Sequence, residues 1–348
     1  MTRWLTGALL LCASAVAVAC PLCIGGVPHS PAQELTFLRQ AVLAVPTADG
    51  GSYRVVEMIR GERPRNDTIE IASFKADAAA LRSGKPLLLV RDASWPTWVN
   101  EGTIGAQHAH LLRQLAAGKH WTEMNADEWR ARVAVMLPYL EDPEPLVAEI
   151  AYGEFASAPY EALRTLKPRL AAAKLRRWID DPRLVQRQST YTLLLGIAGD
   201  ERDAARYEQR IDAAWKAKDG TNLGPMLAAD LELRGASRMT WIEDRYIRDR
   251  NRTTPELEAV LLALSVQANS FGVITRDRVI RSYRIFMQEH KEIAGYVAPD
   301  FAAWQYWDAV PEYVALMKSD LRQQYPSQLA IVAYLKQSPS GAAGVDSK

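Results

Sequence analysis

The sequence predicts a mainly α-helical protein in which a small β unit precedes an array of helical repeats, an α-solenoid. Apolar residues recur at helical spacing from about Trp129 to Lys336, with short turns between the runs. Within this stretch, Glu-Asp-Pro at 141–143 returns as Asp-Asp-Pro at 180–182, 39 residues later, and Tyr152 and Tyr191 follow at equal distances. A period of about 40 residues with two helices per period is typical of helical-repeat arrays.

The first 19 residues are expected to be a signal peptide rather than part of the fold. Arg3 supplies a positive start, Leu5 to Val18 form a short apolar core, and Ala17-Val18-Ala19 is a small-residue cleavage signal. The apolar run is too short for a comfortable membrane span. The sequence therefore predicts an exported protein, in the periplasm or the cell envelope.

The residue after the cleavage signal, Cys20, could carry a lipid that anchors the protein to a membrane. Ala17-Val18-Ala19-Cys20 partly resembles a bacterial lipobox, in which the cysteine is acylated, but Ala17 stands where that pattern prefers leucine or another larger aliphatic residue. Plain cleavage is the favoured interpretation. Lipidation at Cys20 would hold the protein on a membrane.

Cys20 and Cys23 form a C-x-x-C pair at the expected mature amino terminus. A local disulfide is favoured, because exported proteins meet an oxidising compartment. A thioredoxin-like site requires a strand before the cysteine pair, and no strand is expected there. Haem attachment requires histidine at position 24, which is isoleucine in this chain. A Cu(I) or zinc site that includes His29 remains an alternative, although no second C-x-x-C completes it.

The composition is that of a folded protein without a nucleic-acid partner. The chain has 348 residues, 42 of them Lys or Arg and 41 Asp or Glu, for a net charge of +1. Nucleic-acid-binding domains are usually strongly basic. The sequence therefore predicts no nucleic-acid binding.

Short strands are expected after a helix at 31–39. The segments 41–45, 53–59, 68–71 and 86–90 are rich in β-branched or large aliphatic residues, and Asp49-Gly50-Gly51 marks a turn. Such spacing predicts a small antiparallel β unit.

This order of parts resembles the bacterial relatives of the netrin-like (TIMP-like) domain, an OB-type barrel. The resemblance lies in the cysteine at the mature terminus, the helix, and the segments Tyr53 to Gly61 and Gly84 to Val90. It implies an OB-like fold. Domains of that family pair their first cysteines with later ones, and this chain has none after Cys23, so protease inhibition is not carried over.

Residues 92–120 are less informative. Trp95 and Trp98 are expected to be two aromatic anchors of a turn. His108 and His110 would share a face if the segment were a strand, which invites a metal site, but a polar helix start before Leu111 is the favoured interpretation.

The predicted helices each carry an apolar face. We expect the core to include Trp129, Val133, Met136, Leu140, Tyr191, Leu194, Leu195, Ala198, Tyr207, Ile211, Ala214, Trp215, Leu257, Val260, Leu261, Leu264, Val279, Tyr283, Phe286, Met287, Val310, Val314, Met317 and Leu321. Aspartate or threonine beside proline, as at Asp181-Pro182 and Thr254-Pro255, predicts helix starts.

Taken together, the exported cysteine-bearing terminus, the β unit, and the segments Leu140 to Pro143 and Tyr152 to Tyr160 resemble exported bacterial proteins of the planctomycete type with HEAT-like repeats. The resemblance spans most of the mature chain. It implies the architecture and no activity, because no reaction is assigned to that group.

The helical stretch offers two candidate binding features. Arg281 and Arg284 are spaced to point the same way and could bind an anion, although nearby carboxylates offset their charge. Trp304, Tyr306 and Trp307 could line a recognition groove, or could be the packed end of the array.

No catalytic motif of the nucleotide-binding, zinc-protease or serine-hydrolase kind is present. Few histidines are available as a general base, and a pocket containing His108, His110 or His120 would raise the case for an enzyme. No cofactor is expected.

These observations predict a signal peptide at 1–19, a β domain at 20–120, a helical-repeat domain at 121–337 and a disordered tail at 338–348. The predicted function is a non-catalytic scaffold that binds a protein partner in the bacterial envelope, with the membrane reached only through a lipid at Cys20. The alternative is redox or metal handling by Cys20 and Cys23.

Overall fold

The structure is a computed structural model that describes residues 31–64, 66–71, 78–92, 94–95, 97–270 and 272–339. The predicted signal peptide, the Cys20/Cys23 pair with His29, and the tail from residue 340 lie outside the described residues. The chain divides into two compact units, and the break falls between Glu154 and Phe155. This division lies later in the chain than the boundary expected at 120/121.

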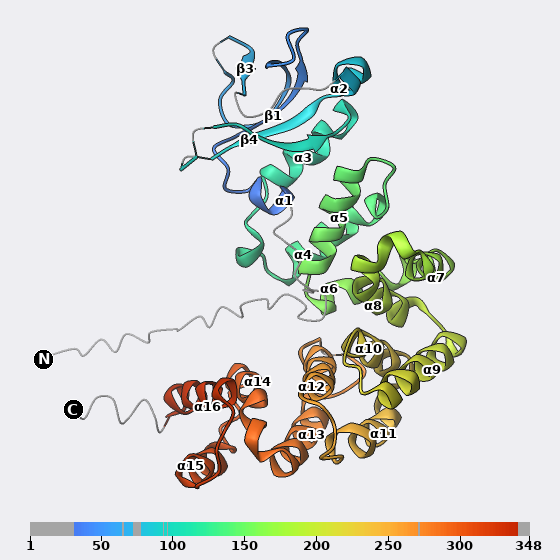
Figure 1. Ribbon diagram of the computed structural model, residues 1–348, viewed down its shortest axis with the longest axis vertical. Helices are drawn as coiled ribbons and strands as arrows, with labels where there is room; N and C mark the ends of the chain where they lie inside the picture. The colour runs from blue at the N-terminus through green and yellow to red at the C-terminus, as the bar shows by residue number, and fades with distance from the viewer. Residues whose placement is uncertain are drawn as a thin grey trace, which may run out of the picture. The chain divides into compact units, whose positions relative to one another are not determined.

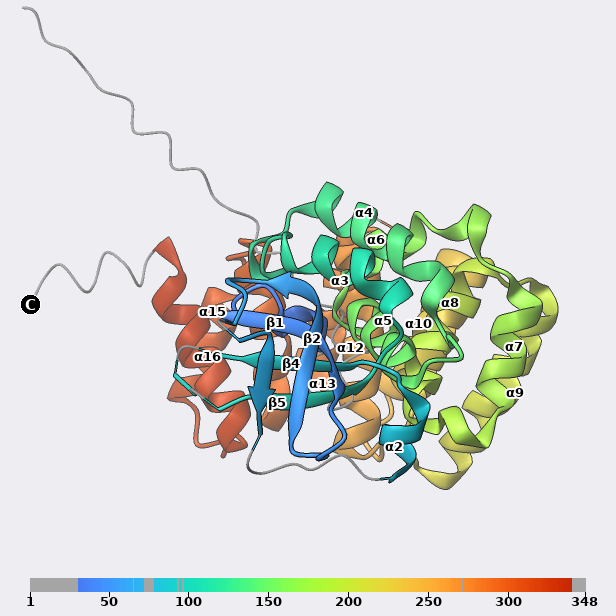
Figure 2. The same cartoon turned by 90° about the horizontal axis from the view of Figure 1, so that it is seen from above.

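The first unit combines a five-stranded antiparallel sheet with short helices (Figure 1). Its elements are α1 (Pro31–Glu34), β1 (Gln40–Pro46), β2 (Ser52–Arg60), β3 (Thr68–Glu70), α2 (Ala78–Ser83), β4 (Leu87–Arg91), β5 (Val99–Thr103), η1 (Ala106–His108), α3 (Ala109–Ala116), η2 (Trp121–Glu123), α4 (Ala126–Met136), η3 (Leu137–Tyr139) and the larger part of α5 (Pro145–Ser157), within which the break falls. The strand order is β3-β2-β1-β4-β5, and Figure 2 shows the strands around the central β1.

The central strand is buried on both faces. Val42 and Ala44 face one way and Ala41 and Leu43 the other, and all four side chains are fully buried. On the first face they join a cluster made of Tyr53, Val55, Ile69, Ile71, Leu87 and Leu89. Burial on two sides explains why β1 is a continuous apolar run rather than an alternating one.

The turn between β1 and β2 is held by one carboxylate. Asp49 accepts hydrogen bonds from the backbone N–H of Gly51 and of Ser52, both at 3.1 Å, and from the Thr47 hydroxyl at 2.6 Å. The Thr47 bond, followed by the Ser52 bonds, lowers the pKa of Asp49 to about 2. The turn predicted at 49–51 is confirmed.

α3 packs against β2. It buries Leu111, Leu112 and Leu115, while Arg60 of β2 donates to the Leu38 carbonyl at 2.7 Å. Arg60 also donates to the Ala116 carbonyl, where its charge complements the negative end of α3.

Three details of the first unit differ from the sequence expectation. The first helix ends at Glu34 rather than near Arg39, because the chain turns so that Phe37 and Leu38 donate to the Glu34 carbonyl. β5 was not predicted. Trp95 is 69% exposed, whereas Trp98 packs beside the sheet cluster and under Arg91.

Replacing Glu154 by glutamine is expected to make stability less dependent on pH. Burial raises the pKa of Glu154 even though Arg132 lies 3.6 Å away. A raised carboxyl pKa contributes stability at low pH that is lost as the pH rises through the folded-state pKa. In urea titrations from pH 4 to 8, the free energy of unfolding of the Gln variant should therefore rise relative to that of the parent protein as the pH rises. A constant difference at every pH would contradict this assignment.

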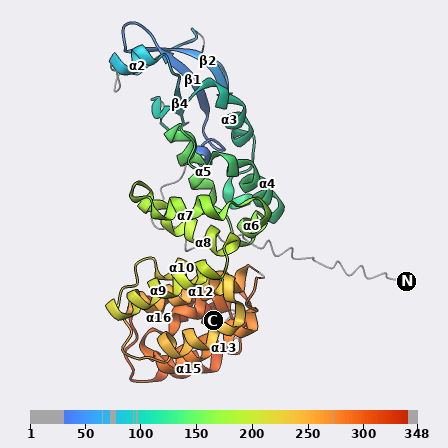
Figure 3. The same cartoon turned by 90° about the vertical axis from the view of Figure 1, so that its right-hand side faces the viewer.

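The second unit is entirely helical among the described residues. Its elements are α6 (Tyr160–Arg164), η4 (Lys167–Arg169), α7 (Ala172–Asp180), η5 (Pro182–Arg187), α8 (Gln188–Ala198), α9 (Glu201–Ala217), α10 (Leu223–Arg234), η6 (Gly235–Arg238), α11 (Met239–Ile242), η7 (Glu243–Ile247), α12 (Thr254–Asn269), α13 (Arg276–Glu289), η8 (Lys291–Val297), α14 (Ala298–Ala303), α15 (Val310–Lys318) and α16 (Tyr325–Gln337). Figure 3 shows α10, α12 and α13 following one another.

α10 is the centre of this unit. Every residue from Leu223 to Leu231 is buried, against α8 and α9 on one side and α12 on the other. α8 comes so close that a methyl group on Gly196 would lie 2.7 Å from the Ala229 Cα atom. A helix that is apolar on all sides is expected at such a central position.

The helix starts follow the predicted capping chemistry with one shift. Asp200 caps α9 and Asp181 caps η5 through side-chain oxygens. The cap of α12 is Thr253, which exchanges bonds with Glu256, rather than the Thr254 beside Pro255.

Three of the polar contacts between successive parts of the helical unit join residues that are 39 apart. Gln267 donates to the Ala228 carbonyl at 3.0 Å, and the Ser282 hydroxyl donates to Glu243 at 2.6 Å. Arg250 bonds Glu289 at 2.8 Å. Each pair is separated by 39 residues, the same interval as the sequence echo.

Candidate functional site

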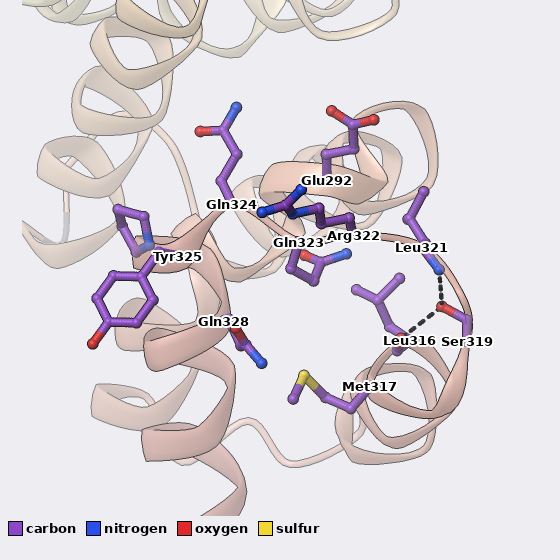
Figure 4. A pocket seen from close by; sticks show the side chains of 11 residues that line it. Glu292, Leu316, Met317, Ser319, Leu321, Arg322, Gln323, Gln324, Tyr325 and Gln328 are labelled. Atoms are coloured by element: carbon purple, nitrogen blue, oxygen red, sulfur yellow. Dashed lines mark hydrogen bonds between the residues drawn. The ribbon is translucent and has the colours of Figure 1, made fainter.

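A hollow of about 860 Å³ opens between the end of α15 and the start of α16 (Figure 4). Its lining is mixed. It consists of the apolar Leu316, Met317, Leu321, Tyr325 and Pro326, the polar Ser319, Gln323, Gln324 and Gln328, and the charged Glu292 and Arg322.

The loop that borders the hollow is fixed by local hydrogen bonds. Ser319 ends α15 by donating its hydroxyl to the Leu316 carbonyl at 2.7 Å. Gln323 donates to the Lys291 carbonyl at 2.7 Å, and the Gln324 N–H donates to the Glu292 carbonyl at 2.9 Å. The 319–324 loop is therefore fastened to η8 rather than free to fill the hollow.

α16 is seated on η8 through a close backbone contact. The Gly295 N–H donates to the Ser327 hydroxyl at 2.8 Å, and Ser327 is fully buried. A methyl group on Gly295 would meet the Ser327 carbonyl oxygen at 2.1 Å. Glycine at 295 thus allows the close approach of α16 to η8.

The last predicted apolar face is only half-buried. Val310, Val314, Met317 and Leu321 were expected in the core, but each keeps partial exposure, and the buried side chain of α15 is Tyr313. Met317 and Leu321 instead line the hollow. A face with a core pattern thus remains incompletely covered by the described residues.

α16 extends this exposed apolar surface. Tyr325 is 70% exposed and Leu329 is 51% exposed, one helical turn apart on the same side. The core side of α16 is made by Ser327, Ile331 and Tyr334. The sequence analysis missed this second face, although Tyr325 and Leu329 are at helical spacing.

Arg322 is the exposed cation of the hollow. It forms no ion pair within the described part of the chain, unlike Arg284, which pairs with Glu312. Arg281 is exposed, and Arg278 is tied to Glu243. Arg281 and Arg284 are therefore not brought together into a shared anion site.

The three aromatic candidates pack against neighbouring helices. Trp304 stacks on Tyr283 with ring centres 5.7 Å apart and donates to the Asn269 side chain at 2.7 Å. Tyr306 lies 4.9 Å from the ring of Phe301. Trp307 lies 5.2 Å from the ring of Tyr334. These contacts favour the packed end of the array over an open recognition groove.

A double-mutant cycle on Trp304 and Asn269 should measure this packing role. Trp304→Phe keeps the stack on Tyr283 and removes the indole N–H donor. We expect a coupling energy between Trp304→Phe and Asn269→Ala of about 0.5–1.5 kcal/mol in urea unfolding, as for one hydrogen bond. Strictly additive effects would mean that the bond contributes nothing to the fold.

The histidines do not form a metal site in the described residues. His108 ends η1, with Nε2 3.6 Å from a Glu144 carboxylate oxygen, and His110 is exposed on α3. His120 bonds the Thr122 hydroxyl. His290 bonds the Ile247 carbonyl at 2.8 Å, and burial lowers its pKa.

Within the ranges that the structure describes, no three His, Cys, Asp or Glu side chains converge as metal ligands. The contact between His108 and Glu144 could not be found by spacing, because the two residues belong to distant elements. Glu144 also accepts from the Gly105 N–H at 2.6 Å, which marks it as a clamp for this loop. The structure thus places His108 in a helix start, as expected.

Among the described residues, the hollow is one feature that could bind another molecule. It holds no paired nucleophile and base, and its open, mixed lining suits noncovalent recognition. In the part of the chain described, no helix combines the length and the apolarity that crossing a membrane requires. Comparisons of the chain with protein-family models, with curated proteins and with solved structures give no match.

Proposed function

We propose that this chain is an exported, non-catalytic α-solenoid of HEAT-like repeats that serves as a protein-interaction scaffold in the bacterial envelope. The observation that carries the proposal is the set of polar ties between residues 39 apart, at Ala228/Gln267, Glu243/Ser282 and Arg250/Glu289. Such ties are expected when equivalent repeats stack on one another. Arrays of this kind present extended surfaces, and protein recognition is their commonest use by analogy.

The distribution of charged side chains also supports a scaffold. Asp203, Glu208 and Glu243 are each bonded to an arginine of another element. Side chains used in this way stabilise the stack and are not available for general acid–base chemistry. We expect a partner protein to contact the partly exposed Met317 and the exposed Tyr325 and Leu329.

In this proposal the first unit is the domain that attaches the helical unit to the cell envelope. Its single antiparallel sheet has five strands and free edges at β3 and β5, which supports an OB-like, partly open barrel. If Cys20 is lipidated rather than simply freed by cleavage, the segment before this unit would join it to a membrane.

Cross-linking in the envelope fraction of the source cells tests the scaffold. A lysine-reactive reagent should link Lys174, Lys216, Lys318 or Lys336 of the helical unit to one or a few other proteins. Lys85 and Lys119 of the first unit serve as the internal comparison. Cross-links confined to this chain would contradict the proposal.

The alternative proposal is redox or metal handling by the C-x-x-C pair at Cys20 and Cys23. Metal analysis and thiol titration of the exported protein decide between the two. Stoichiometric metal or a readily reduced disulfide would favour the alternative. Mass spectrometry of the mature amino terminus, which would carry the acyl chains, distinguishes a lipid anchor at Cys20 from plain cleavage.

A further inference from the structure

His290 is a buried histidine that joins three elements of the helical unit. It directly follows α13 and directly precedes η8, and the residue is only 9% exposed. Its ring stacks on Phe286 of α13 with ring centres 5.2 Å apart. Its Nε2 atom lies 2.8 Å from the carbonyl oxygen of Ile247, at the end of η7. One side chain therefore holds η7 against the junction between α13 and η8.

The bond to Ile247 fixes the position of the proton on the neutral ring. A carbonyl oxygen only accepts hydrogen bonds, so Nε2 donates and the lone pair of the neutral ring lies on Nδ1. The neutral ring thus already satisfies the carbonyl of Ile247, which is a fully buried residue. A second proton would place a positive charge on the buried ring without adding to this bond, and a buried charge is costly unless it is paired.

The charged groups around His290 do not offer that pairing. Burial lowers the pKa of His290, and Arg250 acts in the same direction, whereas Glu289 and Asp249 act against them. Both carboxylates are already used: Glu289 pairs with Arg250 at 2.8 Å, and Asp249 pairs with Arg252 at 2.9 Å. A protonated His290 would therefore compete with two existing ion pairs.

The residues directly after His290 hold the last loop of the helical unit. Lys291 and Glu292 are exposed, and their backbone carbonyls face the 319–324 loop. The Lys291 carbonyl accepts from the Gln323 side chain at 2.7 Å, and the Glu292 carbonyl accepts from the Gln324 N–H at 2.9 Å. Displacement of His290 would therefore move the residues to which this loop is fastened.

We propose that His290 is an acid-sensitive latch: the neutral ring ties η8 to η7, and protonation breaks this tie and loosens η8 together with the 319–324 loop. Histidine is the side chain that ordinarily changes its charge between pH 5 and 8, so the latch is closed at pH 7.5 and opens in mildly acidic surroundings. This device goes beyond the proposed scaffold function, and its test requires no partner.

Urea unfolding of the full chain gives the first test. A histidine whose pKa is lowered by folding contributes stability that is present above its unfolded-state pKa of about 6.5 and is lost as the pH falls through the folded-state pKa. His290→Gln keeps a side-chain N–H donor and does not titrate, and His110→Gln changes an exposed histidine as the control. From pH 7.5 to 5.5, the urea midpoints of the parent protein and of His110→Gln should fall relative to that of His290→Gln. Parallel pH profiles, or the opposite trend, would overturn the proposal.

Amide hydrogen exchange locates the loosening. After correction for the intrinsic exchange rate at each pH, the N–H groups of Gly295 and Gln324 should lose about tenfold or more of their protection between pH 7.5 and 5.5 in the parent protein. In His290→Gln the loss should be less than twofold. The Gly199 N–H, which donates to the Leu195 carbonyl at 2.7 Å, is the internal control and should keep its protection. Equal losses at all three amides, or none at Gly295 and Gln324, would overturn the proposal.

Titration of the His290 ring in the unaltered chain keeps the test independent of how His290→Gln folds. The carbon-13 NMR signal of the His290 Cε1 atom should titrate below about pH 6.5, the ordinary pKa of histidine. Backbone signals of the 319–324 loop should shift over the same pH range. A ring that titrates at or above this pH, or loop signals that do not follow it, would show that His290 is not a latch.

Discussion

Replacing Asp230 by alanine is expected to destabilise the helical unit by about 3 kcal/mol, near the lower end of the range for breaking a buried ion pair. Asp230 is fully buried within α10. It accepts a bond from Arg238 at 2.6 Å and lies 3.6 Å from Arg234. Its removal would leave the largely buried guanidinium groups of Arg234 and Arg238 with less negative charge to balance them.

The size of this effect depends on the neighbours of Asp230. Glu208 is bonded to Arg234 at 2.7 Å and to Arg238 at 3.0 Å, so both arginines keep one carboxylate in the variant. Arg238 also lies 3.5 Å from the ring centre of Trp241, which favours its charge. These contacts place the expected loss near 3 rather than 5 kcal/mol.

Urea unfolding followed by circular dichroism measures the loss, with Asp212→Ala as the matched control. Asp212 also pairs with an arginine, Arg245, but its side chain is 42% exposed. Exposed pairs contribute about 0–1 kcal/mol. Similar losses in Asp230→Ala and Asp212→Ala would show that burial of the α10 network does not govern its contribution.

Gly295→Ala is the second change with a large expected effect, about 2–3 kcal/mol, as for overpacking of a close contact. The added methyl group would lie 2.1 Å from the Ser327 carbonyl oxygen and 2.7 Å from the Ser327 hydroxyl. Both atoms belong to the start of α16, which must move away from η8. The bond from the Gly295 N–H to Ser327 would lengthen or break.

Thermal unfolding of the full chain measures the loss in Gly295→Ala. Gly51→Ala is the control, since a methyl group there meets no atom within 4 Å. An unchanged unfolding temperature in Gly295→Ala would show that the contact is readily relieved.

The predicted core was recovered where helical spacing alone decides burial. Trp129, Tyr191, Tyr207 and Tyr283 are all fully or almost fully buried, as their spacing predicts. The strands at 41–45 and 53–59 likewise correspond to β1 and β2. Local apolar periodicity carries this information, so a single sequence suffices.

The structure differs from the sequence-based prediction where contacts between distant segments decide the secondary structure or the burial of a residue. β5 has the sequence Val-Asn-Glu-Gly-Thr, with little apolar alternation, and it forms by pairing with β4. The face from Val310 to Leu321 has the same spacing as a core face, yet it borders a hollow. Spacing indicates that a face is apolar but not what covers it.

The candidate site could not be found for the same reason. It is assembled from η8, α15, the 319–324 loop and α16, which lie far apart enough in the chain that spacing does not bring them together. The signals that the sequence does offer, arginine density and aromatic clustering, pointed to Arg281, Arg284 and Trp304 instead. Those residues are exposed, ion-paired and stacked, respectively.

Site-specific photo-cross-linking tests the central proposal most directly. A benzophenone side chain is placed at Met317 in the hollow, or at the exposed Val185 as a control, in the full chain in its source cells. The scaffold proposal predicts that position 317 yields one discrete adduct with another protein, which mass spectrometry identifies. No adduct from position 317, or the same adducts from positions 317 and 185, would contradict the proposal.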